Sequence, residues 1–114
     1  MMKKNLRGGS MIFVLTETWP FSSSVEVVKE AVNLAERPSV PEVMKLVGPY
    51  VVMGGDGVKT YTVYEVVATH QTEQALSDIM ARLSGFFRIP GYRASLEVAM
   101  TQTQALQLVG SKAS

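Results

Sequence analysis

The sequence predicts an α+β fold in which four β-strands and two α-helices follow one another in the order β-α-β-β-α-β. Two β-rich segments flank a Gly54-Gly55-Asp56-Gly57 turn, which is typical of a hairpin because Gly and Asp tolerate positive φ angles. A helical apolar pattern lies on each side of this hairpin, and a strand-like segment lies beyond each helical pattern. We therefore expect a four-stranded antiparallel sheet with both helices on one face.

The composition is that of a globular domain. A chain of 114 residues with 46% apolar and 18% charged side chains is long enough for one core. A net charge of +1 gives no reason to expect a nucleic-acid partner. The chain has no cysteine, which excludes disulfides and thiolate zinc sites. The apolar run at residues 11–15 is too short for a membrane span of about 20 residues, so we expect a cytoplasmic protein without a membrane partner.

The chain is predicted to have three parts. Residues 1–10 are expected to be a flexible leader, residues 11–103 the α+β domain, and residues 104–114 a C-terminal tail. The tail has apolar residues at Ala105 and Leu106 that fit a short helix. An extension of the last strand fits them too, so both alternatives remain open.

The first strand and the first helix have clear signals. Residues 11–19 are rich in β-branched and aromatic side chains and end before Pro20, as a strand would. Ser23 and Glu26 have the spacing of a capping box at a helix start. The helix is then expected to bury an apolar stripe and to end before Pro38. This stripe consists of Val25, Val28, Ala31, Val32 and Ala35.

The remaining elements follow from residue 45 onward. The second strand, 45–53, contains Gly48-Pro49, which suits an edge strand or a bulge. The third strand is expected at 58–68 and the fourth strand at 92–100. The second helix is expected to start within residues 69–72. The second helix is predicted to bury a stripe made of Leu76, Ile79, Met80, Leu83, Phe86 and Phe87.

Right-handed crossovers place the first and third strands in the centre of the sheet. The helix-covered face is predicted to carry Ile12, Val14, Thr62, Tyr64, Val66, Leu96 and Val98. The opposite face is predicted to carry Phe13, Leu15, Trp19, Tyr61, Val63 and Val67, mixed with Glu17, Glu65, Arg93 and Glu97. At about 25 cal/mol per Å² of apolar surface, leaving six large side chains in water would forgo several kcal/mol. We therefore expect this opposite face to be covered.

The element order and the two-sided apolar strands resemble the dimeric α/β-barrel group of ferredoxin-like domains. The resemblance covers residues 11–103. It implies a homodimer in which two copies set their sheet faces together around a shared interior. Members of this group include cofactor-independent monooxygenases, small-molecule isomerases, haem-degrading enzymes and ligand-sensing domains, so the resemblance implies a fold and an assembly more than an activity. No cofactor is predicted.

Three residues are candidates for catalysis. Glu17 and Glu65 are candidate general bases, because a carboxylate in a partly buried chamber can accept a proton. His70 is the only histidine, and imidazole transfers protons near neutral pH. The alternatives for the carboxylates are an ion pair with Arg93 or a place at the solvated end of the sheet, and the alternative for His70 is an exposed helix start. No metal site is expected, since no second histidine and no cysteine is present.

The predicted ligand-binding residues are aromatic, apolar and charged. Flat aromatic side chains such as Trp19 would make suitable walls for an aromatic ligand, although ordinary core packing is the alternative. The full set is Trp19, Tyr61, Arg93, Glu97 and Phe13. A phosphate loop at Gly54-Gly55-Asp56-Gly57 is disfavoured, because a strand and not a helix follows it.

The predicted function is that of a small homodimer that binds a hydrophobic or aromatic small molecule in a barrel-like interior. Monooxygenase-like or isomerase-like chemistry is one option for such a chamber. The alternative is a non-catalytic domain that senses a metabolite or docks a protein partner through the same sheet face. An interior that is simply packed shut is the third option.

Overall fold

A computed structural model gives the fold of the chain and describes residues 11–36, 44–67 and 72–113. The predicted leader, 1–10, and most of the predicted start of the second helix lie outside the described residues. His70, one of the three candidate catalytic residues, also lies outside them.

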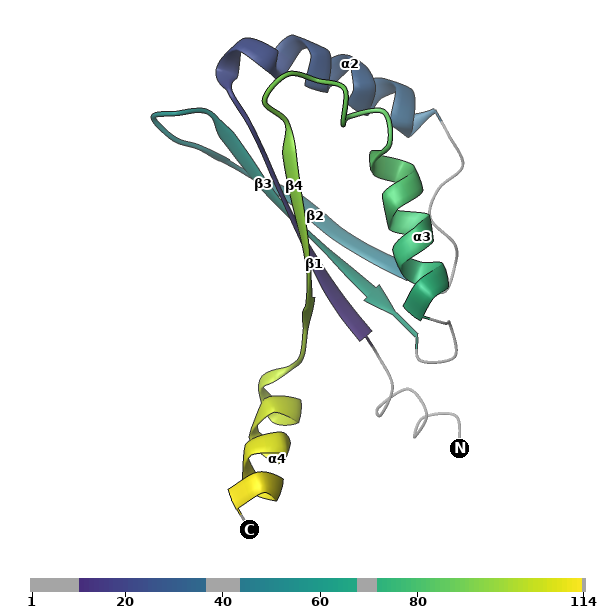
Figure 1. Cartoon of the computed structure of the whole chain (residues 1–114), viewed down its shortest axis with the longest axis vertical. Coiled ribbons are helices and arrows are strands. Elements are labelled where there is room, and N and C mark those ends of the chain that lie inside the picture. The colour runs from purple at the N-terminus through teal and green to yellow at the C-terminus, as the bar shows by residue number, and fades with distance from the viewer. Residues whose placement is uncertain (1–10, 37–43, 68–71, 114) are drawn as a thin grey trace.

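The four strands and two helices follow one another in the predicted order, and two further helical elements are present, a short 3-10 helix after the first strand and a helix at the C-terminal end. The elements are β1 (Met11–Trp19), η1 (Phe21–Ser23), α2 (Ser24–Ala35), β2 (Met44–Met53), β3 (Val58–Val66), α3 (Thr72–Leu83), β4 (Arg93–Ala99) and α4 (Gln102–Ala113). Figure 1 shows α2 and α3 beside the sheet and α4 beyond its end. None of the described helices is long and apolar enough to cross a membrane.

The four strands form one antiparallel sheet in the order β2-β3-β1-β4. The prediction that the first and third strands are central is confirmed. β2 is an edge strand, and its pairing with β3 shifts register between Val47 and Tyr50, where Gly48-Pro49 interrupts the ladder. A proline at this position costs the sheet no central hydrogen bond, which explains why β2 lies at the edge.

The helices cover the sheet face that carries Phe13 and Leu15, which are 0% and 1% exposed. The prediction placed both residues on the opposite face, and this is wrong. The odd-numbered residues of β1 face the helices, whereas the prediction assigned the even-numbered residues to that face. Tyr64 and Val66 of β3 are buried on the helix-covered face, as predicted. The core between this face and α3 is closed by Ala75, Ile79 and Leu83, together with Met44.

The face away from the helices is called the open face below. The register of the four strands assigns sixteen residues to it. They are Ile12, Val14, Thr16 and Thr18 of β1; Lys45, Val47, Tyr50 and Val52 of β2; Lys59, Tyr61, Val63 and Glu65 of β3; and Arg93, Ser95, Glu97 and Ala99 of β4. The open face therefore keeps an apolar centre, but with Ile12 and Val14 in place of Phe13 and Leu15.

α2 packs against the core with a face different from the predicted one. Its buried residues are Val27 and Glu30, whereas Val25, Val28 and Val32 are 65%, 60% and 54% exposed. The predicted capping box is wrong too: the Ser23 side chain makes no cap bond, and its hydroxyl donates to the carbonyl of Pro90 instead. This long-range bond fixes the start of the helix against the loop before β4.

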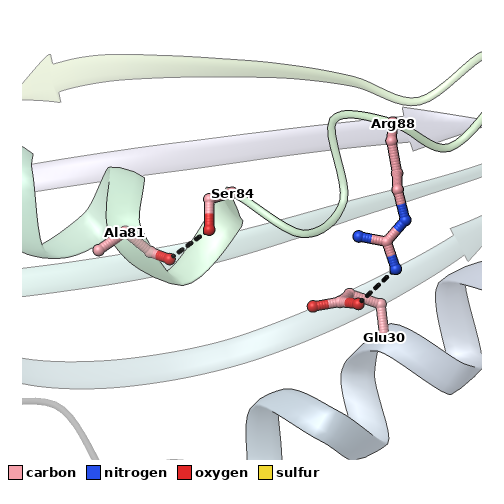
Figure 2. A network of polar contacts seen from close by, with 4 residues as sticks. All are labelled: Glu30, Ala81, Ser84 and Arg88. Carbon is pink, nitrogen blue, oxygen red and sulfur yellow. Dashed lines mark hydrogen bonds and ion pairs between the residues drawn. The ribbon is translucent and has the colours of Figure 1, made fainter.

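A carboxylate takes the place of an apolar side chain in the contact between α2 and that loop. Glu30 is 3% exposed and pairs with Arg88, whose Nη2 lies 3.4 Å from Glu30 Oε1 (Figure 2). A Cβ atom at Gly85 would overlap the Glu30 carboxylate, so the glycine provides the space for it. Because burying a charge is costly unless it is paired, no apolar pattern could have indicated this face of α2.

Two neighbouring valines of α2 test this orientation. We expect Val27→Ala to lower the free energy of unfolding by about 1.5–2.5 kcal/mol, because the side chain is buried and its loss leaves a cavity. Val28→Ala should stay within about 0.5 kcal/mol of the unmodified chain, because Val28 is exposed. Urea unfolding followed by circular dichroism measures both. A larger loss of stability for Val28→Ala than for Val27→Ala would mean that α2 buries the predicted apolar stripe, which contains Val28.

The C-terminal tail is helical, which decides between the two alternatives. Thr101 and Gln104 form a capping box: the Gln104 backbone N–H donates to Thr101 Oγ1 at 3.1 Å, and the Thr101 backbone N–H donates to Gln104 Oε1 at 2.8 Å. α4 lies beyond the end of the sheet (Figure 1), and its Leu106, Leu108 and Val109 are exposed.

Candidate ligand-binding site

An open pocket of about 500 Å³ lies at the end of the sheet where β2 turns into β3. We call it the hairpin pocket. Its walls come from the end of β1, from the β2–β3 hairpin and from the start of β4. The lining residues are Thr18, Trp19, Pro20, Val52, Gly54, Gly55, Asp56, Gly57, Val58, Lys59, Tyr61, Gly91 and Arg93.

Glycines allow the backbone segments around this pocket to approach closely. The hairpin is closed by a bond from the Gly54 N–H to the Gly57 carbonyl at 2.9 Å, which confirms the predicted turn. Gly91 has a φ of +79°, and a Cβ there would overlap the Pro20 ring. A Cβ at Gly57 would likewise overlap the Trp19 carbonyl oxygen. The turn and the loop before β4 can therefore close on the end of β1 only with glycine at these positions.

Two cationic side chains, Lys59 and Arg93, lie on the open face at the pocket, in one row that crosses the four strands. Thr18 of β1 lies opposite Lys59 of β3 on one side and opposite Arg93 of β4 on the other. Val52 extends the same row into β2. Lys59 Nζ lies 5.7 Å from the centre of the Tyr61 ring, within the range of a cation–π interaction. Within residues 11–36, 44–67 and 72–113, neither Lys59 nor Arg93 forms an ion pair.

Trp19 is held in place from the helix side of the sheet. Its indole N–H donates to Ser24 Oγ at 3.1 Å, and its ring stacks on Tyr92 with centres 6.5 Å apart. Tyr92 in turn stacks on Phe86 at 5.3 Å. These contacts hold the Trp19 side chain on the helix side of the sheet, so the prediction that placed it on the opposite face is wrong. Trp19 still lines the pocket from the end of β1.

Glu17 belongs to this supporting layer and not to the open face. Its carboxylate accepts hydrogen bonds from the Tyr92 hydroxyl and from Thr60 Oγ1, the latter at 3.0 Å. Burial raises the pKa of the Tyr92 hydroxyl, and the hydrogen bond to Glu17 raises it further. The prediction that Glu17 shares the opposite sheet face with Glu65 and Glu97 is therefore wrong, because the side chains of β1 lie on the reverse faces from those predicted.

Glu65 and Glu97 lie on the open face, as predicted, but away from the hairpin pocket. Glu65 is exposed and faces Lys45 on β2, near the other end of the sheet. Glu97 lies opposite Val14. Glu97 lies four positions along β4 from Arg93, about 13 Å away. Among the described residues neither Glu65 nor Glu97 pairs with Arg93.

Three of the predicted ligand-binding residues meet in one place, because the hairpin pocket contains Trp19, Tyr61 and Arg93. Phe13 does not line it, since this side chain is buried under α3. The prediction missed Lys59. The alternation of β3 could have identified it, because Lys59 and Tyr61 are two residues apart and so share a face.

No metal centre is evident in the part of the chain that the structure describes. These residues contain no group of three His, Cys, Asp or Glu side chains that could hold an ion.

Comparisons with known proteins report on the fold alone. No family model matches this chain, and no curated protein matches its sequence. Among solved structures, the chain is similar to the de novo designed protein Foldit4, with a TM-score of 0.58, 5% sequence identity, and coverage of 82% of this chain and 99% of that one. A tripeptidase from Staphylococcus aureus matches with a TM-score of 0.41 and 14% identity over 79% of this chain and 28% of that chain. The first match supports an α+β arrangement with a four-stranded antiparallel sheet, which is compatible with a ferredoxin-like fold.

Proposed function

We propose that this chain is a ferredoxin-like domain that forms a homodimer of the dimeric α/β-barrel kind and binds a hydrophobic or aromatic small molecule in the hairpin pocket. The observation that carries the proposal is the open face, whose apolar centre ends in a pocket with an aromatic wall. Pockets of 300–1,000 Å³ with apolar walls and a few polar groups are typical of small-molecule sites.

The apolar centre of the open face supports the homodimer. Val14 and Val63 lie opposite each other there, with Val47 beside Val63 on β2. Tyr50 and Val52 are 60% and 49% exposed on the same face. Contiguous apolar patches of this kind are uncommon on monomers and typically mark an interaction surface. A second copy of the chain offers the same patch, which suits a two-fold symmetric contact.

A charge in the centre of the open face tests the homodimer. We expect the unmodified chain to run at twice its chain mass in size-exclusion chromatography with light scattering, and Val63→Glu to run at the chain mass. An unpaired carboxylate buried in the contact would cost several kcal/mol, whereas in the monomer it faces water and leaves the fold intact. Val25→Glu, on the exposed surface of α2, is the matched control and should remain dimeric. An unmodified chain of single mass at high concentration would contradict the dimer.

The ionisable residues of the pocket favour recognition over catalysis. They are Lys59, Arg93 and Asp56, while the candidate base Glu65 lies toward the other end of the sheet and Glu17 is engaged by Tyr92. We therefore favour a non-catalytic function, in which the protein senses or carries a metabolite. Monooxygenase-like or isomerase-like chemistry would require a proton acceptor at the pocket. Asp56 is the one carboxylate among the described lining residues, and it lies exposed on the hairpin turn, where water solvates it, whereas a general base gains from partial burial.

Native mass spectrometry of the protein purified from its own host tests the ligand-binding role. We expect a retained small molecule on the unmodified protein and its loss in Tyr61→Ala, which removes part of the pocket wall. Val25→Ala is the control, because Val25 is exposed on α2, outside both the open face and the pocket lining. A bare mass for the unmodified protein, with circular dichroism showing it folded, would count against the proposed function.

A further inference from the structure

We infer that the ligand of the hairpin pocket carries a carboxylate, and that Lys59 and Arg93 bind this group while the apolar wall holds the remainder of the molecule. The inference rests on the proposed function and specifies its ligand class. Its basis is the juxtaposition of two cationic side chains with the apolar and aromatic wall of the pocket.

The strand register brings the two cations toward one point. Lys59 and Arg93 occupy the same row of the open face, each adjacent to Thr18 on the central strand β1. Neighbouring strands are about 4.8 Å apart, so the two backbone positions are about 10 Å apart. Side chains as long as lysine and arginine can span half of that distance. A carboxylate above Thr18 can thus contact the ammonium, the guanidinium and the Thr18 hydroxyl together, and arginine holds carboxylates with two parallel hydrogen bonds.

The charges of the pocket suit an anion with one negative charge. Its lining contains two cations, Lys59 and Arg93, and one carboxylate, Asp56, which leaves one positive charge in excess. Among the described residues, no carboxylate forms an ion pair with either cation. Lys59 Nζ instead lies 5.7 Å from the centre of the Tyr61 ring, and both residues line the pocket. A monocarboxylate would therefore neutralise the pocket, whereas a cationic ligand would be repelled.

The apolar part of the pocket determines the size and the apolar character of the rest of the ligand. Val52 and Tyr61 flank Lys59, and Trp19 and Pro20 close the end of β1. Since the volume is about 500 Å³, the pocket accommodates one or two fused rings or an equivalent aliphatic group beside the carboxylate. The ligand class is therefore an aromatic or branched aliphatic monocarboxylic acid.

The test compares two probes of the same shape, 2-naphthoate and 2-naphthylmethanol, by isothermal titration calorimetry on the full chain. We expect 2-naphthoate to bind at least about tenfold more tightly than the neutral alcohol. Lys59→Met and Arg93→Met should each weaken 2-naphthoate by about tenfold and leave the alcohol unchanged. Lys45→Met is the matched control, because Lys45 is a cation of the same open face outside the pocket, and it should bind 2-naphthoate as the unmodified chain does.

The outcomes separate this inference from the proposed function. Equal affinity for both probes, together with Lys59→Met and Arg93→Met variants that bind 2-naphthoate normally, would overturn the carboxylate site and leave a small-molecule pocket in place. Binding of neither probe, with the unmodified chain folded by circular dichroism and no molecule retained from the host, would overturn both. Weakening by Lys45→Met equal to that by Lys59→Met would also overturn the inference, because the effect would then be one of overall charge.

Discussion

Phe13→Ala is expected to lower the free energy of unfolding by about 3–5 kcal/mol, a large part of the stability of a domain of this size. Phe13 is fully buried, and it packs in the cluster that joins β1 and β3 to α3. Removing its ring would leave a cavity that close-packed neighbours fill only in part. Urea unfolding followed by circular dichroism measures the change.

The matched control is Phe21→Ala, the same substitution at a phenylalanine that is 49% exposed. We expect this variant to lose less than about 1 kcal/mol. The pair also decides the role of Phe13, because a residue that lined a ligand chamber could be shortened while the fold stayed stable. If the Phe13→Ala variant were as stable as the Phe21→Ala variant, Phe13 would not be a core residue, and its predicted role in ligand binding would stand.

The face of β1 could not be predicted from its own residues. Residues 11–15 are apolar on both sides of the strand, and a strand pattern without polar residues does not indicate which side is inside. In β3 the exposed Lys59 and Glu65 alternate with the buried Tyr64 and Val66, so the same reasoning gave the correct faces. The number and order of strands were predictable, because hairpin turns and crossovers depend on local signals. The side of β1 depends on what packs against it.

The two capping signals show the same limit. Thr101-Gln102-Thr103-Gln104 and Ser23-Ser24-Val25-Glu26 both have the capping-box spacing, and only the first forms the box. The Thr101 hydroxyl accepts the hydrogen bond of the Gln104 backbone N–H in the same turn. The Ser23 hydroxyl instead meets the Pro90 carbonyl, a partner 67 residues away in the chain. A local motif was overridden here by a tertiary contact.

The candidate site was predictable in the part that depends on strand alternation. Tyr61 and Arg93 were placed on the correct face, and they line the pocket. The contribution of the turn and of the loop before β4 was not predictable, because it depends on how closely Gly57 and Gly91 approach the end of β1. The buried partner of Glu17 was missed for a related reason: Tyr92 follows a turn whose path the sequence does not specify.

The bond between Tyr92 and Glu17 predicts a specific loss of stability in alkaline solution. Burial and the bond to the Glu17 carboxylate raise the pKa of the Tyr92 hydroxyl above its ordinary value of 10.0. Burial also raises the pKa of Tyr64, although the nearby Arg82 partly offsets the shift. Both hydroxyls therefore stay protonated in the folded chain at a pH where they ionise in the unfolded chain. Their contribution to stability is complete below pH 10 and is lost as the pH rises above it.

The expected slope is up to about 1.4 kcal/mol per pH unit for each of these two tyrosines above pH 10. Tyr92→Phe should remove one of the two contributions and so reduce the slope. At neutral pH the same variant should lower the free energy of unfolding by about 1.5–3 kcal/mol, because Glu17 loses a hydrogen bond to its charged carboxylate. Tyr50→Phe, at an exposed tyrosine, is the control and should keep the stability of the unmodified chain at neutral pH.

Urea unfolding at a series of pH values from 7 to 11 measures both effects in one experiment. A Tyr92→Phe variant with the stability of the unmodified chain at pH 7 would mean that the hydroxyl bond contributes nothing to the fold. An unchanged alkaline slope would mean that Tyr92 ionises equally in the folded and unfolded chain. Tyr92 also stacks on Trp19, which lines the hairpin pocket, and its hydroxyl bond to Glu17 holds the ring in this position. The Tyr92→Phe variant keeps the ring, so a change in ligand affinity would be assigned to the lost bond with Glu17.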